Sequence, residues 1–400
     1  MMRKYNWIIR LAAVIMAASV AAGAAGCSGG AAAEDIKGQG QSETGQTEKE
    51  TLKLALVGPM TGDNSQYGQQ FERAVTEAVE AYNAKGQIQV TVDIFDDKND
   101  AKESVSIANK ILAAEDYAAI IGPFSSTCAL AMAEVTDEEK MLTVAPTCSH
   151  ADYVSLYDYT YRLAHTNTYE GEVAAQYEKD TWNCTKVAGI YSNNDWGIAI
   201  AEAYKAKAES LGMEVAANEA FVQGQTKDFS ATLTKIRESG AEAIFYMGQY
   251  AEAGTILKQM KDMGMDDIKM LLSTGTKIET AELAGDAAKD AVFLQTFYVD
   301  PSNEKVVRTA DMFKEKYGCP VDHFLMRTYD GVNWFLEAYD KCQSTDPDKL
   351  AEAMNEIGKA GFDGMGGYFK MGDDRNLQRE FYYCRWNGKS GNEIGFELIK

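Results

Sequence analysis

The chain has 400 residues, with 39 Lys and Arg against 60 Asp and Glu, which gives a formal net charge of −21 at pH 7. Such an acidic surface repels nucleic acid and excludes that class of partner. The six cysteines after Cys27 show neither CxxC spacing nor a cluster with histidine, so no metal or other cofactor is predicted.

The N-terminal segment has the pattern of an export signal. Arg3, Lys4 and Arg10 supply positive charge, and the surrounding apolar and small residues include no acid. Small residues directly before Cys27 predict a lipoprotein signal peptide over residues 1–26, cleaved so that the cysteine carries lipid. A plain signal cleaved elsewhere and a single uncleaved membrane helix are the alternatives.

The segment 27–51 contains no aromatic residue and one bulky aliphatic, so it predicts a flexible tether after the lipidated cysteine. About 350 residues follow, a length that favours two lobes over one core. No later segment offers about 18 unbroken apolar residues, so no further membrane span is predicted.

Strands and helices then alternate. Apolar runs ending in turns predict strands at 52–60, 89–97, 117–123 and 141–147, and apolar residues at helical spacing predict helices at 66–86, 104–116 and 126–140. This order indicates a parallel sheet with helices on both faces.

A second set of elements follows the first. Strands are predicted at 186–197, 213–222, 241–250 and 268–275, with helices at 198–212, 229–240 and 252–264. Two more helices are predicted at 306–318 and 327–342, and two strands joined by a turn at 367–389.

The predicted fold is therefore α/β, with two doubly wound parallel-sheet lobes. Ligands of open α/β sheets bind at the carboxyl ends of the strands. We expect a ligand cleft between the lobes, which close over it by a hinge.

Sequence signatures of enzymes are missing. There is no G-x-S-x-G, no G-x-x-x-x-G-K-[ST], and no G-x-G-x-x-G after a strand. A pair of Ser126 and His150 is conceivable, but no companion motif supports it. We predict no catalytic residue and no enzymatic activity.

Two strand-to-helix turns carry hydroxyl groups. "GPFSSTC" (122–128) presents Ser126, and "APTCSH" (145–150) presents Thr147 and Ser149. Hydroxyls and the free N–H groups of a helix start suit a carboxylate. Each turn alone could be an ordinary helix cap, but two turns on successive strands favour a binding site.

Three aromatic residues lie on other predicted loops, where packing in the core is a weaker explanation than on a strand. They are Tyr67, Trp196 and Tyr250. Core packing and a place in the cleft both remain open for them.

Several segments together resemble a known family, the type I periplasmic binding proteins of ABC importers, in the leucine/isoleucine/valine-binding branch. The resemblance runs over Leu52–Lys400, and its carriers include "LKLALVGPMTGDNSQYGQQFERAVTEAVEAYNAKG", "IIGPFSSTCALAMAEV", "MLTVAPTCS", "YSNNDWGIAIAEAYKAK" and "RTYDGVNWFLEAY".

The resemblance implies an architecture and partners. One lobe would comprise 52–165 plus 299–367, and the other 166–298 plus 368–400. The protein would be a monomer outside the cytoplasm, held to the membrane by its lipid. It would pass a small-molecule ligand, an amino acid or related carboxylate, to ABC permease and ATPase subunits.

The resemblance also implies roles for individual residues. The ligand carboxylate would be held by the hydroxyls of the two turns, and the three loop aromatics would line the cleft. Phe324 matches a position that walls the side-chain pocket, and Trp196 stands where the family typically has tyrosine.

One departure concerns Thr274. In this family an acidic residue at the matching position pairs with the ligand ammonium, and a buried ammonium without such a partner is unfavourable. Another acid such as Asp195 or Glu252 could take the role, or hydroxyls and carbonyls alone could hold the ammonium. The ligand could also lack an ammonium, as a keto acid, aromatic acid or small amide does.

Two other functions remain alternatives to an importer subunit. One is a ligand sensor that signals to a partner. The other is a hydrolase that uses Ser126 and His150.

Overall fold

A computed structural model describes residues 51–399, apart from 87, 319, 378–379, 388 and 390–394. The predicted signal peptide, Cys27 and nearly all of the predicted tether lie outside these residues, so the expectations about them stay predictions.

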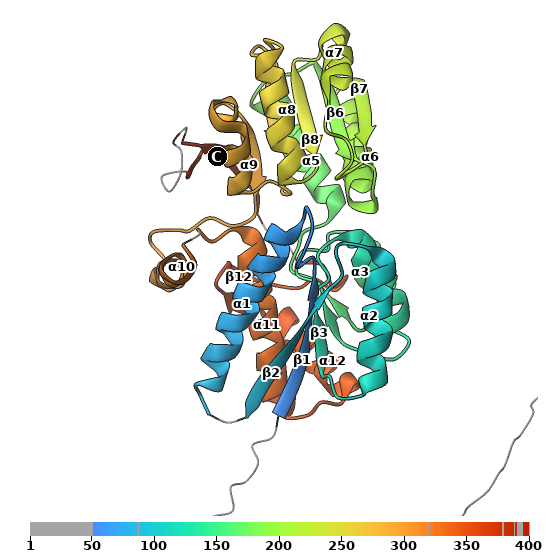
Figure 1. The fold of residues 1–400 in the computed structure, drawn as a ribbon, viewed down its shortest axis with the longest axis vertical. Coiled ribbons are helices and arrows are strands. Elements are labelled where there is room, and N and C mark those ends of the chain that lie inside the picture. The colour runs from blue at the N-terminus through green and yellow to red at the C-terminus, as the bar shows by residue number, and fades with distance from the viewer. Residues whose placement is uncertain are drawn as a thin grey trace, which may run out of the picture. The chain divides into compact units, whose positions relative to one another are not determined.

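The first half of the described chain forms a five-stranded sheet in the order β2-β1-β3-β4-β5, with every pair parallel (Figure 1). Its elements are β1 (Thr51–Gly58), α1 (Ser65–Asn83), β2 (Gln89–Asp96), α2 (Ala101–Ala114), β3 (Ala119–Ile121), α3 (Ser126–Thr136), β4 (Thr143–Val144), α4 (Asp152–Ser155) and β5 (Thr160–Tyr161).

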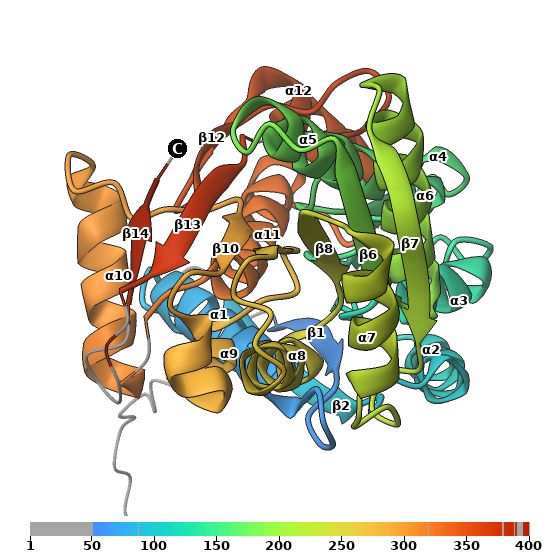
Figure 2. The same cartoon turned by 90° about the horizontal axis from the view of Figure 1, so that it is seen from above.

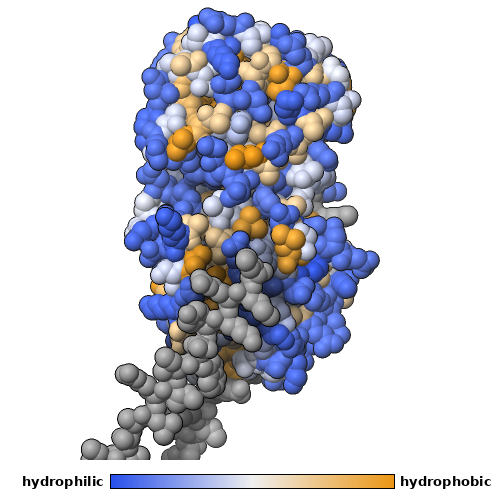
Figure 3. Space-filling model, turned by 90° about the vertical axis from the view of Figure 1, so that its right-hand side faces the viewer, coloured by the Kyte–Doolittle hydropathy of each residue, from blue (hydrophilic) through white to orange (hydrophobic). Residues whose placement is uncertain are grey.

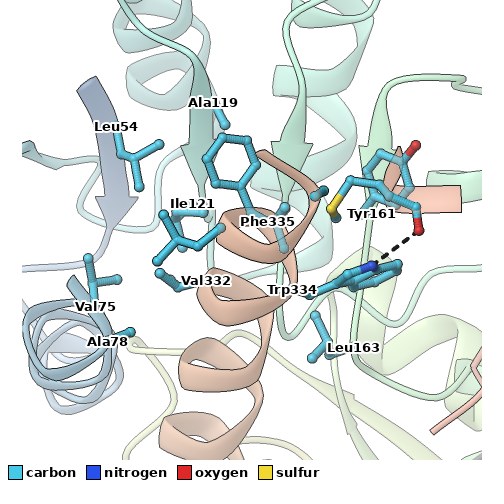
Figure 4. Close-up of a cluster of buried hydrophobic side chains, with 14 of the residues drawn as sticks. Leu54, Val75, Ala78, Ala119, Ile121, Tyr161, Leu163, Val332, Trp334 and Phe335 are labelled. Atoms are coloured by element: carbon cyan, nitrogen blue, oxygen red, sulfur yellow. Dashed lines mark hydrogen bonds between the residues drawn. The ribbon is translucent and has the colours of Figure 1, made fainter. Parts of the chain in front are cut away.

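The near-continuous apolar sequence of β1 follows from burial on both faces. Leu54 and Leu56 pack with α1 and with α11 (His323–Cys342), whereas Ala55 and Val57 pack with α2 and α3. Figure 4 shows the first of these clusters, with side chains of α11 between β1, β3 and α1.

The second half forms a seven-stranded sheet in the order β14-β13-β10-β9-β8-β6-β7. Its first elements are α5 (Asn167–Asp180), β6 (Lys186–Ser192), α6 (Asp195–Ser210), β7 (Glu214–Phe221), α7 (Ser230–Ser239), β8 (Ala243–Met247), α8 (Tyr250–Asp262), β9 (Lys269–Leu272), α9 (Ile278–Ala284), the 3-10 helix η1 (Gly285–Ala288) and β10 (Val292–Gln295). The run β7-β6-β8-β9-β10 repeats the strand order of the first sheet, which confirms the predicted tandem α/β halves.

Helices also cover both faces of the second sheet (Figure 2). Ile244 and Tyr246 of β8 pack with α7, α8 and α9, while Ala243 and Phe245 of the same strand pack with α5 and α6. Side chains that alternate along a strand therefore meet two separate helix layers, as in the first sheet.

The remaining elements correct two predictions. They are α10 (Glu304–Tyr317), α12 (Pro347–Ala360), β11 (Phe362–Gly364), β12 (Gly367–Phe369), β13 (Tyr382–Trp386) and β14 (Phe396–Leu398). β13 is antiparallel to β10 and β14, so the second sheet is mixed rather than wholly parallel. The two strands predicted within 367–389 do not form a hairpin, because β12 pairs with β11 in a separate sheet.

The sequence predictions omitted several elements, among them α5, α9, β10 and α12. α5 begins after Thr166, whose hydroxyl accepts a hydrogen bond from the Tyr169 N–H at 3.2 Å. This is an ordinary helix cap, and the omission of α5 matters because the helix carries a residue of the candidate site.

Candidate functional site

A cavity of about 30 Å³ lies where the carboxyl ends of strands from both sheets meet. It is lined by Phe124, Ser125, Ser126, Thr127, Thr147, Ser149, His165, Asn194, Trp196, Gln249, Thr274, Gly275, Phe324 and Arg327. Six of the eight ligand-binding residues predicted from sequence are in this set. Neutral hydroxyl and amide groups make up most of its polar lining.

The first hydroxyl turn follows β3. Gly122 permits a close approach here, because a Cβ at this position would lie 1.9 Å from the carbonyl oxygen of Val57. Ser125 caps α3, and its Oγ accepts from the Cys128 N–H at 3.4 Å. Because Ser125 takes the capping role, the buried Ser126 is left to face the cavity.

Ser126 Oγ accepts from two neighbours, the Ser149 N–H at 3.4 Å and the Cys148 thiol at 3.8 Å. Its own hydroxyl proton is therefore available to an acceptor in the cavity. A donor beside the first turn of α3 is the arrangement that an anionic group requires.

The second hydroxyl turn follows β4. We predict from the sequence that it starts a helix, and this prediction is wrong. The next helix, α4, begins only at Asp152 and has four residues. The turn instead packs against its neighbours: the Thr147 hydroxyl donates to the carbonyl oxygen of Phe124 at 2.7 Å, and the Ser149 hydroxyl donates to Asn167 Oδ1. The two turns are thus joined, without a second helix dipole.

The second sheet contributes turns of its own. Asn194 caps α6, and its Oδ1 accepts from the Gly197 N–H at 2.9 Å. Trp196 in the first turn of α6, Gln249 before α8, and Thr274 and Gly275 after β9 complete this side of the cavity.

Tyr67 and Tyr250 are not among the residues that line the cavity. Tyr67 is fully buried, its ring stacks on Phe124 at 4.2 Å between centroids, and its hydroxyl donates to the carbonyl oxygen of Gly275 at 2.7 Å. The Tyr250 hydroxyl donates to the carbonyl oxygen of Asp63 at 3.0 Å. Both tyrosines therefore connect the two sheets' turns beside the cavity.

A buried network extends from Thr274. The Thr274 N–H and hydroxyl donate to Glu170 Oε1 and Oε2 at 2.7 and 3.0 Å, and His165 Nε2 lies 2.8 Å from Glu170 Oε2. Arg327 Nη2 lies 3.2 Å from His165 Nδ1 and also donates to Thr296 Oγ1. A histidine thus separates a buried cation from a buried carboxylate.

Burial lowers the pKa of His165 to about 4, so its imidazole is neutral at pH 7. Because Nε2 faces the Glu170 carboxylate and Nδ1 faces an arginine donor, we infer that the proton is on Nε2. His165 then donates to the acid and accepts from the arginine, which satisfies both charged neighbours.

Sequence reasoning missed His165, Glu170 and Arg327. Thr166 and Glu170 stand at the start of a helical pattern, which could have revealed α5. Nothing local to Arg327 indicated that it reaches a cavity.

The acids proposed from sequence already have hydrogen-bond partners, and the partner of Asp195, Thr127, is a residue of the cavity lining. Asp195 Oδ2 accepts from the Thr127 hydroxyl at 2.6 Å, and Glu252 Oε1 accepts from the Gly224 N–H at 2.8 Å. Neither lines the cavity.

The conceivable catalytic pair is not assembled in the described structure. His150 Nδ1 accepts from the Asp152 N–H at 3.3 Å, whereas Ser126 Oγ is directed to Ser149. The neighbouring thiols are also poor nucleophiles, since burial raises the pKa of Cys128 to about 11 and also that of Cys148.

Two doubly wound sheets with a cavity at their facing strand ends define the type I periplasmic binding protein fold. Residues 51–392 match the model of the family described as "Periplasmic binding protein", and the chain belongs to this family. This result confirms the resemblance noted from the sequence.

Named relatives and solved structures are similar to this chain. "Leu/Ile/Val-binding protein homolog 1" of Brucella abortus is 31% identical over 315 residues, covering 76% of this chain and 82% of that protein. The branched-chain amino acid transporter substrate-binding protein of Streptococcus pneumoniae, solved with isoleucine, has a TM-score of 0.80 at 23% identity and covers 88% of this chain and 100% of that one. An R. palustris solute-binding protein solved with benzoate has a TM-score of 0.78 at 18% identity, covering 87% and 96%.

No helix within the described residues has the length and apolar character needed to cross a bilayer. The face shown in Figure 3 is mostly hydrophilic, with hydrophobic side chains in scattered patches.

Proposed function

We propose that this protein is the extracytoplasmic solute-binding subunit of an ABC importer and that it binds an amino acid or a related small carboxylate. The ligand occupies the cavity between the two sheets. The observation that carries the proposal is the set of hydrogen-bond donors at Ser126 and the first turn of α3. These donors line a cavity at the point where strand ends of the two sheets face one another.

The family supports this assignment, since it consists of solute-binding proteins and this chain's relatives are named for amino acids. Structures of the same fold hold isoleucine in one case and benzoate in another. The fold is therefore compatible with more than one class of carboxylate.

Opening of the two lobes is part of the proposal. A cavity of about 30 Å³ has room for about two water molecules, which is less than an amino acid needs. The lobes, which we place at 52–165 plus 299–367 and 166–298 plus 368–400, separate to admit the ligand and then close around it.

Attachment and delivery complete the proposal. Cys27 carries a lipid that anchors the protein to the membrane, where the closed form meets the permease. Cys27→Ala should release the protein from the membrane fraction into the medium or periplasm. Retention of the variant in the membrane fraction would contradict the lipid anchor.

Ligand binding is tested by a thermal-shift screen of the mature chain against amino acids, 2-oxo acids and aromatic acids. A ligand that binds only the folded state raises the melting temperature, by an amount that grows with the logarithm of its concentration relative to Kd. Calorimetry on the hits should give one site per chain. A complete absence of hits among these acids would contradict the proposed function.

A further inference from the structure

We propose that the cavity selects a carboxylate without an ammonium group, of the 2-oxo acid type, and that Arg327 is the residue that sets this preference. This inference rests on the proposed function, because it names the ligand class of the same site.

The charges on the cavity wall point to such a ligand. Among the described residues that line it, Arg327 is the one permanent charge, and none is acidic. Arg327 is 2% exposed, so its guanidinium lies in a poorly hydrated environment where electrostatic interactions are stronger than in water. A group placed against it must accept a hydrogen bond, as a carbonyl oxygen does and an ammonium cannot.

The nearest buried acid does not face the cavity. Glu170 is fully buried behind Thr274, and its two oxygens already receive three donors from Thr274 and His165. These donors fill three of about four acceptor positions of the carboxylate, and Glu170 does not line the cavity, so it is poorly placed to pair with a ligand ammonium. The carboxylate instead orients the neutral His165, which in turn accepts from Arg327.

The remaining polar groups fit the same ligand. A carboxylate can be held by the Ser126 hydroxyl and the start of α3, while an adjacent oxo group accepts from Arg327. An ammonium in that place would lose its hydration shell without a carboxylate partner and would lie on the same wall as a fixed positive charge.

Matched ligands provide the test on the unmodified mature protein. L-leucine and 4-methyl-2-oxopentanoate share a carbon skeleton and a carboxylate, and differ in the ammonium and oxo groups. We expect calorimetry to show the 2-oxo acid binding at least 30-fold more tightly. L-leucine binding equally well or better would overturn this inference and leave the proposed function intact, whereas no binding of either acid, or of any acid in the screen, would overturn both.

Arg327→Gln tests the assigned residue, with Arg308→Gln as the matched control, since Arg308 is exposed and pairs with Glu304 on α10. The quantity compared is the affinity for 4-methyl-2-oxopentanoate divided by the affinity for L-leucine. Among folded variants, R327Q should reduce this ratio at least tenfold, and R308Q should leave it unchanged. An unchanged ratio in R327Q would overturn the role of Arg327. If R327Q does not fold, Arg327→Lys should keep the direction of the preference, and a reversed preference in that variant would overturn the role.

Discussion

The two hydroxyl turns and the network behind Thr274 meet at the same cavity but are built differently. In the turns, Ser125, Ser126, Thr147 and Ser149 lie within 25 residues, and the hydrogen bonds that position them span from 3 to 23 residues. In the network, Thr274 meets Glu170 across 104 residues and Arg327 meets His165 across 162. In our proposal, Ser126 in the first turn holds the carboxylate that many ligands share, whereas the network sets which other polar group the ligand carries.

The largest expected effect comes from moving the network's acid into the cavity wall. In a double variant, Thr274→Glu with Glu170→Gln, the preference for L-leucine over 4-methyl-2-oxopentanoate should rise about 100-fold, or roughly 3 kcal/mol, because the ammonium gains a buried partner. Glu170→Gln alone is the control and should bring no such rise. If calorimetry finds that the folded double variant has the same preference between the two ligands as the unmodified protein, charge at position 274 does not set the ligand class.

The network should also make stability depend on pH. His165 has its pKa lowered from 6.5 to about 4 in the folded chain, so the unfolded chain binds its proton first as the pH falls. The free energy of unfolding should therefore drop by up to roughly 3 kcal/mol between pH 6.5 and pH 4 from this group.

Urea unfolding at a series of pH values checks this prediction. His165→Gln should remove that part of the pH dependence, while His150→Gln, at a histidine that reaches solvent, serves as the control. Identical pH profiles for wild type and the folded His165 variant would show that His165 is not the group responsible.

A substitution in the first hydroxyl turn should change the affinity for the ligand. Ser126→Ala should weaken binding of the preferred carboxylate by about 1–3 kcal/mol, because a buried acceptor on the ligand loses the Ser126 hydroxyl as a donor. Calorimetry measures this, with Ser210→Ala at the exposed end of α6 as the control. Wild-type affinity in the Ser126 variant would exclude this hydroxyl from the site.

The smallest expected effect is on stability. It separates the capping role of Ser125 from the ligand-binding role that we propose for Ser126 in the same turn. Ser125→Ala should lower the free energy of unfolding by about 1 kcal/mol, since α3 loses its cap. Denaturant unfolding measures this change directly. A change well below that value would mean that Ser125 does not act as the cap.

Sequence periodicity was sufficient for four parallel strands of each sheet, β1 to β4 and β6 to β9, and it missed β5 and β10. A central strand such as β1 is buried on two faces, as Leu54 and Ala55 show, and such a strand reads as an unbroken apolar run between helices. It was not sufficient for β13, because antiparallel pairing with β10 is a contact between segments about 90 residues apart. The second hydroxyl turn was misread as a helix start for a related reason, since the Thr147 and Ser149 hydroxyls are taken by Phe124 and Asn167.

The family, the two α/β halves and the hydroxyls of the first turn as candidate ligand contacts can all be read from the order of residues, since a cap or a strand end is specified by a few consecutive residues. The three-dimensional fold was needed to find that Tyr67 and Tyr250 pack beside the cavity and that Glu170, rather than Asp195 or Glu252, is the acid behind Thr274. Those outcomes depend on which strand ends face one another, and no local pattern of residues records that.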